Sequence, residues 1–301
     1  MSNLVATNRP RRSVLYMPGS NARALEKART LAADVVILDL EDAVAPDAKA
    51  VAREQVAAAV TAGGFGHREV VVRINGLDTA WGKADLSAVA ATGPDVILIP
   101  KVNGPGDLLG AGRARAAAGT PAHVRVWAMM ETPLAMLNAG AIAAAAADAT
   151  TRLSGFVMGT NDLAKETGAR IVPGRAPMNA WLMTCLAAAR AHGLVIVDGV
   201  WNEIADEAGF LKECDEARDM GFDGKTLIHP NQIAGCNAAF SPAEAEVAWA
   251  RKIIAAFALP ENAAKGALQV EGRMVERLHA DMAARLVAIA EAIAARETPA
   301  A

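Results

Sequence analysis

The sequence is poor in cysteine. Its 301 residues include only three, Cys185, Cys214 and Cys236. None of them stands in a C-x-x-C arrangement, so their spacing indicates neither a zinc site nor a redox pair. A few widely separated cysteines are typical of proteins in a reducing compartment. We therefore expect a cytoplasmic protein.

A long apolar run is also lacking. The longest one, residues 139–147, is dominated by alanine and falls far short of the roughly 20 residues that span a bilayer. Residues 1–13 contain arginines but no apolar stretch behind them, so we expect no signal peptide. Both observations predict a protein without a membrane partner.

Neither sign of charge dominates, and aromatic residues are scarce. The formal net charge of -3 argues against a broad nucleic-acid-binding surface, although a local basic pocket for a phosphorylated ligand is compatible with it. Aromatics make up only 4% of the residues, whereas hydrophobic residues make up 53%. This composition favours a large buried core in which many alanine-rich helices pack closely on a sheet.

Eight short apolar runs alternate with longer alanine-rich segments that have a helical pattern, such as residues 21–33, 47–62 and 179–192. Most runs are β-branched and apolar on both faces, as strands buried in a closed parallel sheet are. Eight strand–helix units predict a (β/α)8 TIM barrel, which forms one domain of about 250 residues. An open doubly wound sheet is the main alternative, but no G-x-G-x-x-G follows the first strand. The predicted strands are residues 14–17, 35–40, 70–74, 96–99, 124–130, 155–158, 194–197 and 226–228.

The chain continues for some seventy residues after the eighth strand. We predict a TIM-barrel catalytic domain over residues 1–240 and a C-terminal helical extension over residues 241–301, which packs on the barrel, on a neighbouring subunit or over the active-site mouth as a lid. A helix is predicted over residues 241–256, with Ser241 as its N-cap and Glu244 closing a capping box. Residues 273–296 predict one or two amphipathic helices.

Polar side chains follow the carboxyl ends of all eight predicted strands, where barrel enzymes build their active sites. Glu131 and Asp162 follow strands five and six, whose backbones lie about 4.8 Å apart in a sheet. Two carboxylates so close repel each other unless a hard cation neutralises them. With no histidine at either strand end, the pair predicts Mg²⁺, with Mn²⁺ as a substitute, rather than zinc. The alternative is a shared proton or a salt bridge to Arg73 or Lys101.

Arg73 ends the third strand and needs an anionic partner, because burying an unpaired charge is costly. That partner is a substrate carboxylate, a thioester oxygen that becomes an enolate, or Glu41. Either of the first two would let Arg73 stabilise developing negative charge.

An acidic cluster, Asp39, Glu41 and Asp42, follows the second strand. These carboxylates could hydrogen-bond metal-bound water, or Asp42 could pair with Lys49 or Arg53. Lys101, after the fourth strand, is expected to fix either Glu131 or the substrate.

With these residues in place, the sequence resembles the citrate lyase beta subunit family and its free-standing relatives, the malyl-CoA and citramalyl-CoA lyases of the HpcH/HpaI aldolase/citrate lyase superfamily. The resemblance runs from Arg11 to about Met282 and is specific because the motifs occur together and in order. The motifs are RRSVLYMPGSNARALEKA, VVILDLEDAVAPDAKAVAR, VVVRINGLDTAWGKADL, LIPKV, METPLAML, GTNDLAKE and GKTLIHPNQI.

The resemblance implies a magnesium-dependent barrel that assembles as a homotrimer or homohexamer. Glu131 and Asp162 match its two metal ligands, and Arg73 matches the arginine that contacts the acyl-enolate. The opening segment, with Arg12, Asn21 and Lys27, falls where relatives bind the CoA phosphates and adenosine. Arg73 and Lys101 complete the predicted substrate-binding set.

Two positions depart from the family pattern. Asn161 precedes Asp162 where many relatives carry glutamate. Glu276 stands where relatives often place an aspartate that reaches the active site of a neighbouring subunit. The longer glutamate could retain the acid–base role, serve a different substrate or accompany a lost activity.

The predicted reaction is reversible carbon–carbon cleavage of a 3-hydroxyacyl-CoA, such as citramalyl-CoA or malyl-CoA, to acetyl-CoA and pyruvate or glyoxylate. The predicted catalytic residues are Arg73, Glu276, Glu41 and Asp42. Three alternatives stay open: a malyl-CoA thioesterase, an aldolase that acts on a free 2-oxo acid without CoA, and a non-catalytic or acyl-carrier-dependent subunit of a lyase complex.

Overall fold

A computed structural model describes residues 9–297 of the chain. Residues 298–301 lie outside the described part, and so do residues 1–8, which make up most of the stretch where no signal peptide is expected. The chain divides into two compact units, one containing Arg11–Phe240 and the other containing the residues from Ser241 onward. None of the described helices is long and apolar enough to cross a membrane.

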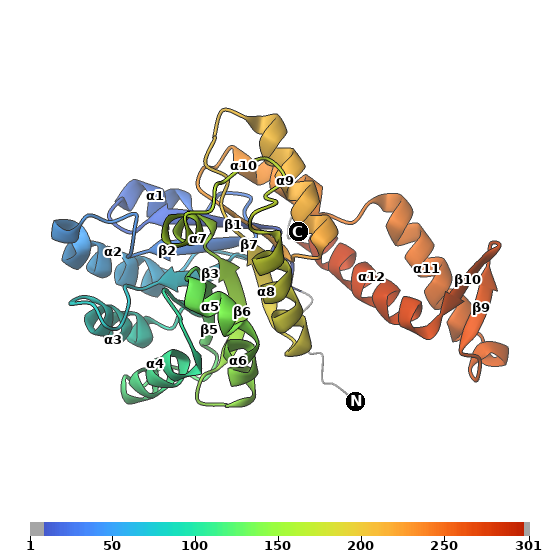
Figure 1. The fold of residues 1–301 in the computed structure, drawn as a ribbon, viewed down its shortest axis with the longest axis horizontal. Coiled ribbons are helices and arrows are strands. Elements are labelled where there is room, and N and C mark those ends of the chain that lie inside the picture. Colours follow the sequence, from blue (N-terminus) through green and yellow to red (C-terminus); the bar gives the residue numbers. More distant parts are fainter. Residues whose placement is uncertain (1–8, 298–301) are drawn as a thin grey trace. The chain divides into compact units, whose positions relative to one another are not determined.

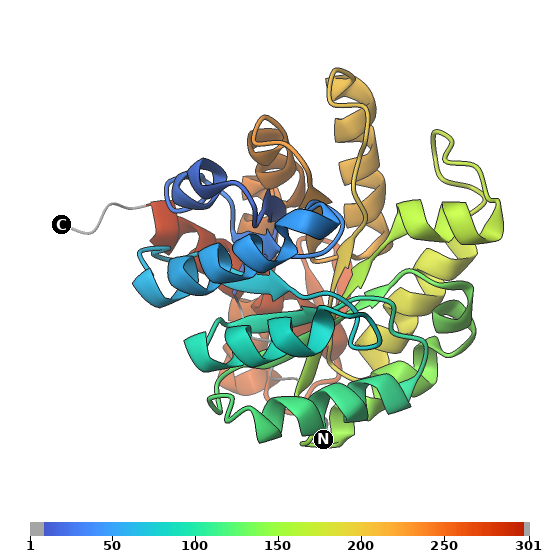
Figure 2. The same ribbon diagram turned by 90° about the vertical axis from the view of Figure 1, so that its left-hand side faces the viewer.

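The first unit is a closed barrel of eight parallel strands in chain order, with the last strand paired to the first. This confirms the predicted (β/α)8 fold, and Figure 2 shows its helices surrounding the strands. The strands are β1 (Ser13–Pro18), β2 (Val35–Asp39), β3 (Glu69–Arg73), β4 (Val96–Ile99), β5 (Arg125–Met130), β6 (Leu153–Met158), β7 (Val195–Asp198) and β8 (Gly224–Leu227). The helices are α1 (Ala22–Lys27), α2 (Lys49–Ala62), α3 (Gly82–Thr92), α4 (Pro105–Ala117), α5 (Pro133–Leu137), α6 (Ala139–Ala144), α7 (Thr160–Thr167), α8 (Asn179–Ala191), α9 (Glu207–Met220) and α10 (Gln232–Phe240), with 3-10 turns at Pro46–Ala48 and Ala145–Ala147.

Side chains alternate between two apolar clusters along the strands, as the two-residue period of a strand requires. A small cluster includes Val35 and Ile37 of β2, Val71 of β3 and Trp127 and Met129 of β5. The large cluster takes the intervening residues and the helices. Two residues further along the chain from Ile37, Val71 and Met129 stand Asp39, Arg73 and Glu131, which therefore point to the same side of the sheet as the small cluster. Strand periodicity therefore places these three charged side chains at the mouth of the barrel.

The first helix is shorter than predicted. The pattern indicated a helix over residues 21–33, but α1 ends at Lys27 and the chain continues through turns to β2. The Asn21 side chain caps this helix by accepting a hydrogen bond from the Ala24 N–H (3.1 Å).

The second unit contains two helices and a two-stranded antiparallel sheet (Figure 1). Its elements are α11 (Glu244–Ala258), a 3-10 turn (Pro260–Asn262), β9 (Ala267–Val270), β10 (Arg273–Glu276) and α12 (Arg277–Glu297). Ala250, Ile253 and Phe257 of α11 form its core with Val275 and Ala283.

Two predictions for this unit are wrong. Helix α11 begins at Glu244 rather than Ser241, and Glu246 rather than Glu244 accepts the hydrogen bond from the N-cap N–H of Ala243 (2.9 Å). Residues 273–276 form a strand and not a helix, because they pair with β9 across a turn whose residues Glu271 and Gly272 adopt positive φ. Positive φ is incompatible with a continuous helix.

Candidate active site

Arg73 and Asp39 form the centre of the polar mouth. They are register partners on β3 and β2, so their side chains leave the barrel side by side. The guanidinium donates two hydrogen bonds of 2.7 Å, one from Nε and one from Nη2, to the two carboxylate oxygens. Burial alone would raise the pKa of Asp39, but the charge and hydrogen bonds of Arg73 lower it. The pair is therefore ionised.

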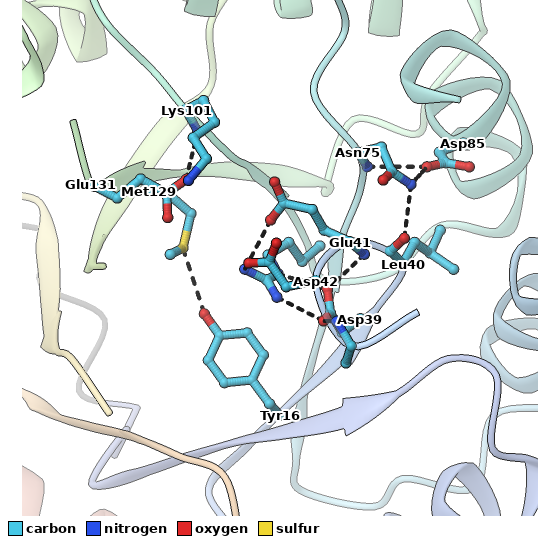
Figure 3. A network of polar contacts seen from close by, with 12 residues as sticks. Tyr16, Asp39, Leu40, Glu41, Asp42, Asn75, Asp85, Lys101, Met129 and Glu131 are labelled. Carbon is cyan, nitrogen blue, oxygen red and sulfur yellow. Dashed lines mark hydrogen bonds and ion pairs between the residues drawn. The ribbon is translucent and has the colours of Figure 1, made fainter. Parts of the chain in front are cut away.

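The third nitrogen of Arg73 faces the segment that follows β2. Nη1 lies 2.9 Å from Glu41 Oε2 and 3.2 Å from Asp42 Oδ2. The guanidinium also stacks 4.8 Å above the ring of Tyr16, whose hydroxyl points to Met129 Sδ at 3.6 Å. Figure 3 shows Asp39, Glu41 and Asp42 gathered around this centre. The sequence offered Glu41 as a protein partner of Arg73, but it missed Asp39 as the main one.

Glu41 has an unusual protonation equilibrium. Burial raises its pKa to about 8; Arg73 opposes this, whereas Glu131, Asp42 and Asp39 add to it. Among the described residues Oε2 has no hydrogen-bond partner in spite of its proximity to Arg73. A carboxyl group that titrates near neutral pH can both donate and accept a proton, as general acid–base catalysis requires.

Glu131 follows β5 and is fully buried. Its Oε1 accepts a hydrogen bond of 2.7 Å from the backbone N–H of Lys101, whereas Oε2 has no partner among the described residues. Burial raises the pKa of Glu131 to about 7, although Lys101 and Arg73 oppose the shift. A buried carboxylate oxygen without a partner is costly, and a bound cation would remove that cost.

Asp162 lies in the first turn of α7, after β6. Lys101 links Asp162 to Glu131 by ion pairs. Its Nζ lies 2.6 Å from Asp162 Oδ1 and 3.7 Å from Glu131 Oε1. The salt bridge to Lys101, one of the alternatives offered by the sequence, is therefore present. Both carboxylates therefore face the same ammonium group.

No group of three or more His, Cys, Asp or Glu side chains between residues 9 and 297 is arranged to hold a metal ion. A cage made only of protein ligands is therefore not present in that part of the chain. Magnesium does not need one, because it binds through one or two carboxylates and fills its other positions with water or substrate oxygens. Glu131 and Asp162, one with a partnerless oxygen, fit that ligand set.

A layer of hydrogen bonds supports the segment that carries Glu41 and Asp42. The carbonyl of Leu40 accepts from Asn75 Nδ2 (2.8 Å) and from Lys49 Nζ (2.9 Å). Lys49 also donates to the Glu41 carbonyl (2.7 Å). The suggested pairing of Asp42 with Lys49 or Arg53 does not occur, because Lys49 binds carbonyls and Arg53 binds the buried Asp85 (2.7 Å).

The three residues expected to bind CoA lie in different places. Asn21 and Lys27 are exposed at the two ends of α1, which follows the carboxyl end of β1 and so belongs to the rim of the site. Arg12 precedes β1, at the opposite end of the strand. Its guanidinium is buried and paired with Asp34, which precedes β2 (2.9 Å). The structure therefore does not bring Arg12 to the rim.

A second buried ionic network joins the end of β7 to the beginning of β8, and sequence reasoning did not identify it. Arg175 Nη1 binds both oxygens of Asp198 (2.7 and 2.8 Å), and Lys225 Nζ binds Asp198 (2.8 Å) and Glu213 (2.6 Å). Its only signal in the sequence was Asp198 at a strand end. Glu276, in contrast, belongs to the second unit, where it ends β10 and its N–H donates to His279 Nδ1 (2.9 Å).

Comparison with known proteins agrees with this arrangement. The family model described as HpcH/HpaI aldolase/citrate lyase matches residues 12–230. A (3S)-malyl-CoA thioesterase of Cereibacter sphaeroides is 54% identical over 286 residues, which cover 95% of this chain and 96% of the relative. The citrate lyase subunit beta of Escherichia coli is 33% identical and covers 96% of each chain.

A solved structure of the CitE protein of Mycobacterium tuberculosis, in complex with magnesium, acetoacetate and coenzyme A, has the same fold. It matches with a TM-score of 0.74 and 30% identity, over 94% of this chain and 99% of that one.

Proposed function

The chain belongs to the HpcH/HpaI aldolase/citrate lyase family, and from this premise we propose that it is a magnesium-dependent hydrolase of a malyl-CoA-type thioester. The observation that carries the proposal is the 54% identity with a (3S)-malyl-CoA thioesterase over 95% of the chain. The magnesium and coenzyme A bound by the related CitE protein support the cofactor and the substrate class.

Glu131 and Asp162 would hold the ion. Magnesium bound there supplies a Lewis acid that orients and polarises substrate oxygens. Nη1 of Arg73 faces Glu41 and Asp42, and its positive charge would stabilise negative charge on a substrate oxygen bound beside them. Because Asp39 binds the other two nitrogens, the guanidinium is held in one orientation.

Glu41 is the proposed general base. A carboxyl group whose pKa is about 8 takes a proton from water more effectively than an ordinary glutamate does, since its basicity is close to that required at neutral pH. Water that loses its proton to Glu41 adds to the thioester carbonyl. The carbon–sulfur bond then breaks, and the proton returns to the leaving thiolate. Asp42 contacts the same nitrogen of Arg73 and is the second proposed acid–base residue.

The reaction predicted first from the sequence, carbon–carbon cleavage, is the second candidate. It is favoured by the 33% identity with the citrate lyase beta subunit and by related structures that contain magnesium with oxaloacetate or pyruvate. The same residues would serve it: Glu41 would take the proton of the substrate hydroxyl, and Arg73 would stabilise the enolate that leaves.

The remaining expectations stay proposals. Asn21, Lys27 and Lys101 are proposed to contact the CoA ester from the rim, and Glu276 is proposed to handle a proton in a neighbouring subunit's site. We propose a cytoplasmic homotrimer or homohexamer without a nucleic-acid or membrane partner.

The two other alternative functions can be tested directly. A CoA-independent aldolase would turn over free 2-oxo acids. A carrier-dependent subunit would not be stabilised against heat by free CoA.

The decisive experiment incubates the purified chain and Mg²⁺ with malyl-CoA, citramalyl-CoA and related 3-hydroxyacyl-CoA esters, and measures free thiol and 2-oxo acid separately. Thiol without oxo acid supports hydrolysis, whereas oxo acid without thiol supports the lyase. Glu131→Ala and Asp162→Ala should each abolish the metal-dependent signal. Glu166→Gln, on the exposed face of the helix that carries Asp162, is the matched control and should leave it unchanged.

A further inference from the structure

Lys101 contacts both proposed metal ligands with different parts of the same residue. Its backbone N–H holds Glu131 Oε1 (2.7 Å), and its ammonium reaches Asp162 Oδ1 (2.6 Å). Lys101 has a φ of 51°, in the left-handed region that residues with a Cβ rarely adopt. The contacts with Glu131 and Asp162 accompany this unfavourable backbone conformation.

The ammonium is charged in this position. Burial lowers the pKa of Lys101, but Glu131 and Asp162 outweigh burial and raise it. The cation thus neutralises two carboxylates that would otherwise repel each other, one of them fully buried. A divalent cation held by the same two carboxylates would perform the same electrostatic task.

The two cations cannot both be close to Asp162 without repelling each other. Lys101 can leave, because 35% of its side chain is exposed and its four-carbon stem is flexible, whereas Glu131 is fixed in the barrel. At the rim, a displaced ammonium would find a new partner in an anionic substrate.

We propose that Lys101 is an internal counter-cation that competes with Mg²⁺ for Asp162 and Glu131, so that metal binding becomes tight only when an anionic substrate accepts the displaced ammonium. This inference rests on the magnesium site of the proposed function. It makes Lys101 a residue that couples metal binding to substrate binding, in addition to its contact with Glu131.

The test is isothermal titration of Mg²⁺ into the purified full-length chain, with and without saturating pyruvate. In Lys101→Met, Mg²⁺ alone should bind about tenfold more tightly than in the wild type, because one positive charge has left the site. Pyruvate should raise the Mg²⁺ affinity of the wild type more than that of the variant. Without metal the variant should melt at a lower temperature than the wild type, and Mg²⁺ should raise its melting temperature more.

Two variants control this experiment. Lys165→Met removes a lysine from α7, the helix of Asp162, but that side chain is exposed and forms no ion pair with Glu131 or Asp162 in the described structure, so Mg²⁺ affinity should change less than about twofold. Lys101→Arg keeps the charge and should retain the wild-type coupling between Mg²⁺ and pyruvate. If Lys101→Met does not fold, Lys101→Gln provides the same charge removal with a side chain that can still donate to Asp162.

The outcomes separate the two proposals. Wild-type protein that binds no Mg²⁺ even with saturating pyruvate overturns the proposed metal-dependent function. Wild-type protein that binds Mg²⁺, together with a folded Lys101→Met or Lys101→Gln that binds it no more tightly, overturns only the role of Lys101.

Discussion

Gly159 lies against Glu131 so closely that any side chain at position 159 would collide with the carboxylate. A β-carbon there would come within 2.7 Å of Glu131 Oε2 and closer still to Glu131 Cβ. The φ of Gly159 is -104°, which any residue can adopt, so the requirement for glycine is steric. Gly159, between β6 and α7, therefore leaves the room that the Glu131 side chain occupies.

Gly159→Ala should displace Glu131 and weaken Mg²⁺ binding by at least about tenfold, since metal sites need their ligands within about 0.5 Å of the correct position. Isothermal titration with Mg²⁺ measures this loss. The matched control is Gly140→Ala in α6, where a β-carbon would meet nothing within 4 Å; it should keep the wild-type affinity and stabilise the helix slightly. Unchanged Mg²⁺ affinity in a folded Gly159→Ala protein would contradict this account.

Breaking the Arg73–Asp39 pair should be costly. Arg73→Met leaves the buried Asp39 carboxylate without its counter-ion, and Asp39→Asn leaves the buried guanidinium with only Glu41 and Asp42 as anionic partners; each should lower the free energy of unfolding by roughly 3–5 kcal/mol. The double variant should cost much less than the sum, because neither charge then remains alone. Urea unfolding of the four proteins measures the coupling.

The exposed ion pair of Arg251 and Glu291 (3.4 Å) is the control for this comparison of single and double variants. Its coupling should be less than about 1 kcal/mol, as is usual for ion pairs in solvent. If the losses of stability at Arg73 and Asp39 were additive, the hydrogen bonds between the two side chains would contribute nothing to the free energy of unfolding.

The barrel was predictable because its signal is local. Eight apolar runs bounded by turn residues specify eight buried strands, and strand periodicity then places Asp39, Arg73 and Glu131 at one mouth. The convergence of Glu131 and Asp162 could be expected from their positions after adjacent strands. These inferences needed only the order of elements and the period of a strand.

What the sequence did not indicate depends on register and on long-range hydrogen bonds. The pairing of Arg73 with Asp39 follows from the alignment of β2 and β3, which no single strand reveals. The bridge between Lys225 and Glu213 likewise joins a strand to a helix. In the second unit, Arg273–Glu276 was assigned to a helix because its pairing with Ala267–Val270 is visible only when both segments are placed.

The stability of the metal-free protein should depend on pH through Glu41. Its pKa rises from the ordinary value of 4.5 in the unfolded chain to about 8 in the folded one. Between these values the folded protein retains a proton that the unfolded chain has released, so the contribution of Glu41 to stability is fully present below about pH 4.5 and is lost as the pH rises through 8.

Urea unfolding in EDTA between pH 5 and pH 9 tests this linkage. Glu41→Gln cannot ionise at that position, so it should become more stable relative to the wild type as the pH rises, by on the order of a few kcal/mol. Glu131 also titrates in this range and interacts with Glu41, so the difference between the two proteins includes the loss of that interaction. The free energy of unfolding of Glu166→Gln should depend on pH as that of the wild type does. The same pH dependence in Glu41→Gln would refute the raised pKa of Glu41.

Glu276 provides the test of cooperation between subunits. If its carboxylate handles a proton in a neighbouring site, Glu276→Gln should lower turnover by roughly 100-fold while leaving Mg²⁺ affinity unchanged. Glu271→Gln, in the same antiparallel hairpin and paired only with the exposed Lys252 in the described structure, should remain active. Equal losses in both variants would instead indicate damage to the hairpin.

A mixing experiment distinguishes action in a neighbouring subunit from action within one chain. Glu276→Gln lacks the donated group but has intact metal ligands, whereas Glu131→Gln lacks a ligand but can still donate Glu276. When the two inactive proteins are dissociated and reassembled together, about a quarter of the sites combine one good ligand set with one good Glu276 if each site is shared between two chains. Activity should then return toward that fraction of the wild-type value. Activity that stays at the level of the separate variants, in oligomers shown to be mixed, would place Glu276 in its own chain's site or outside the reaction.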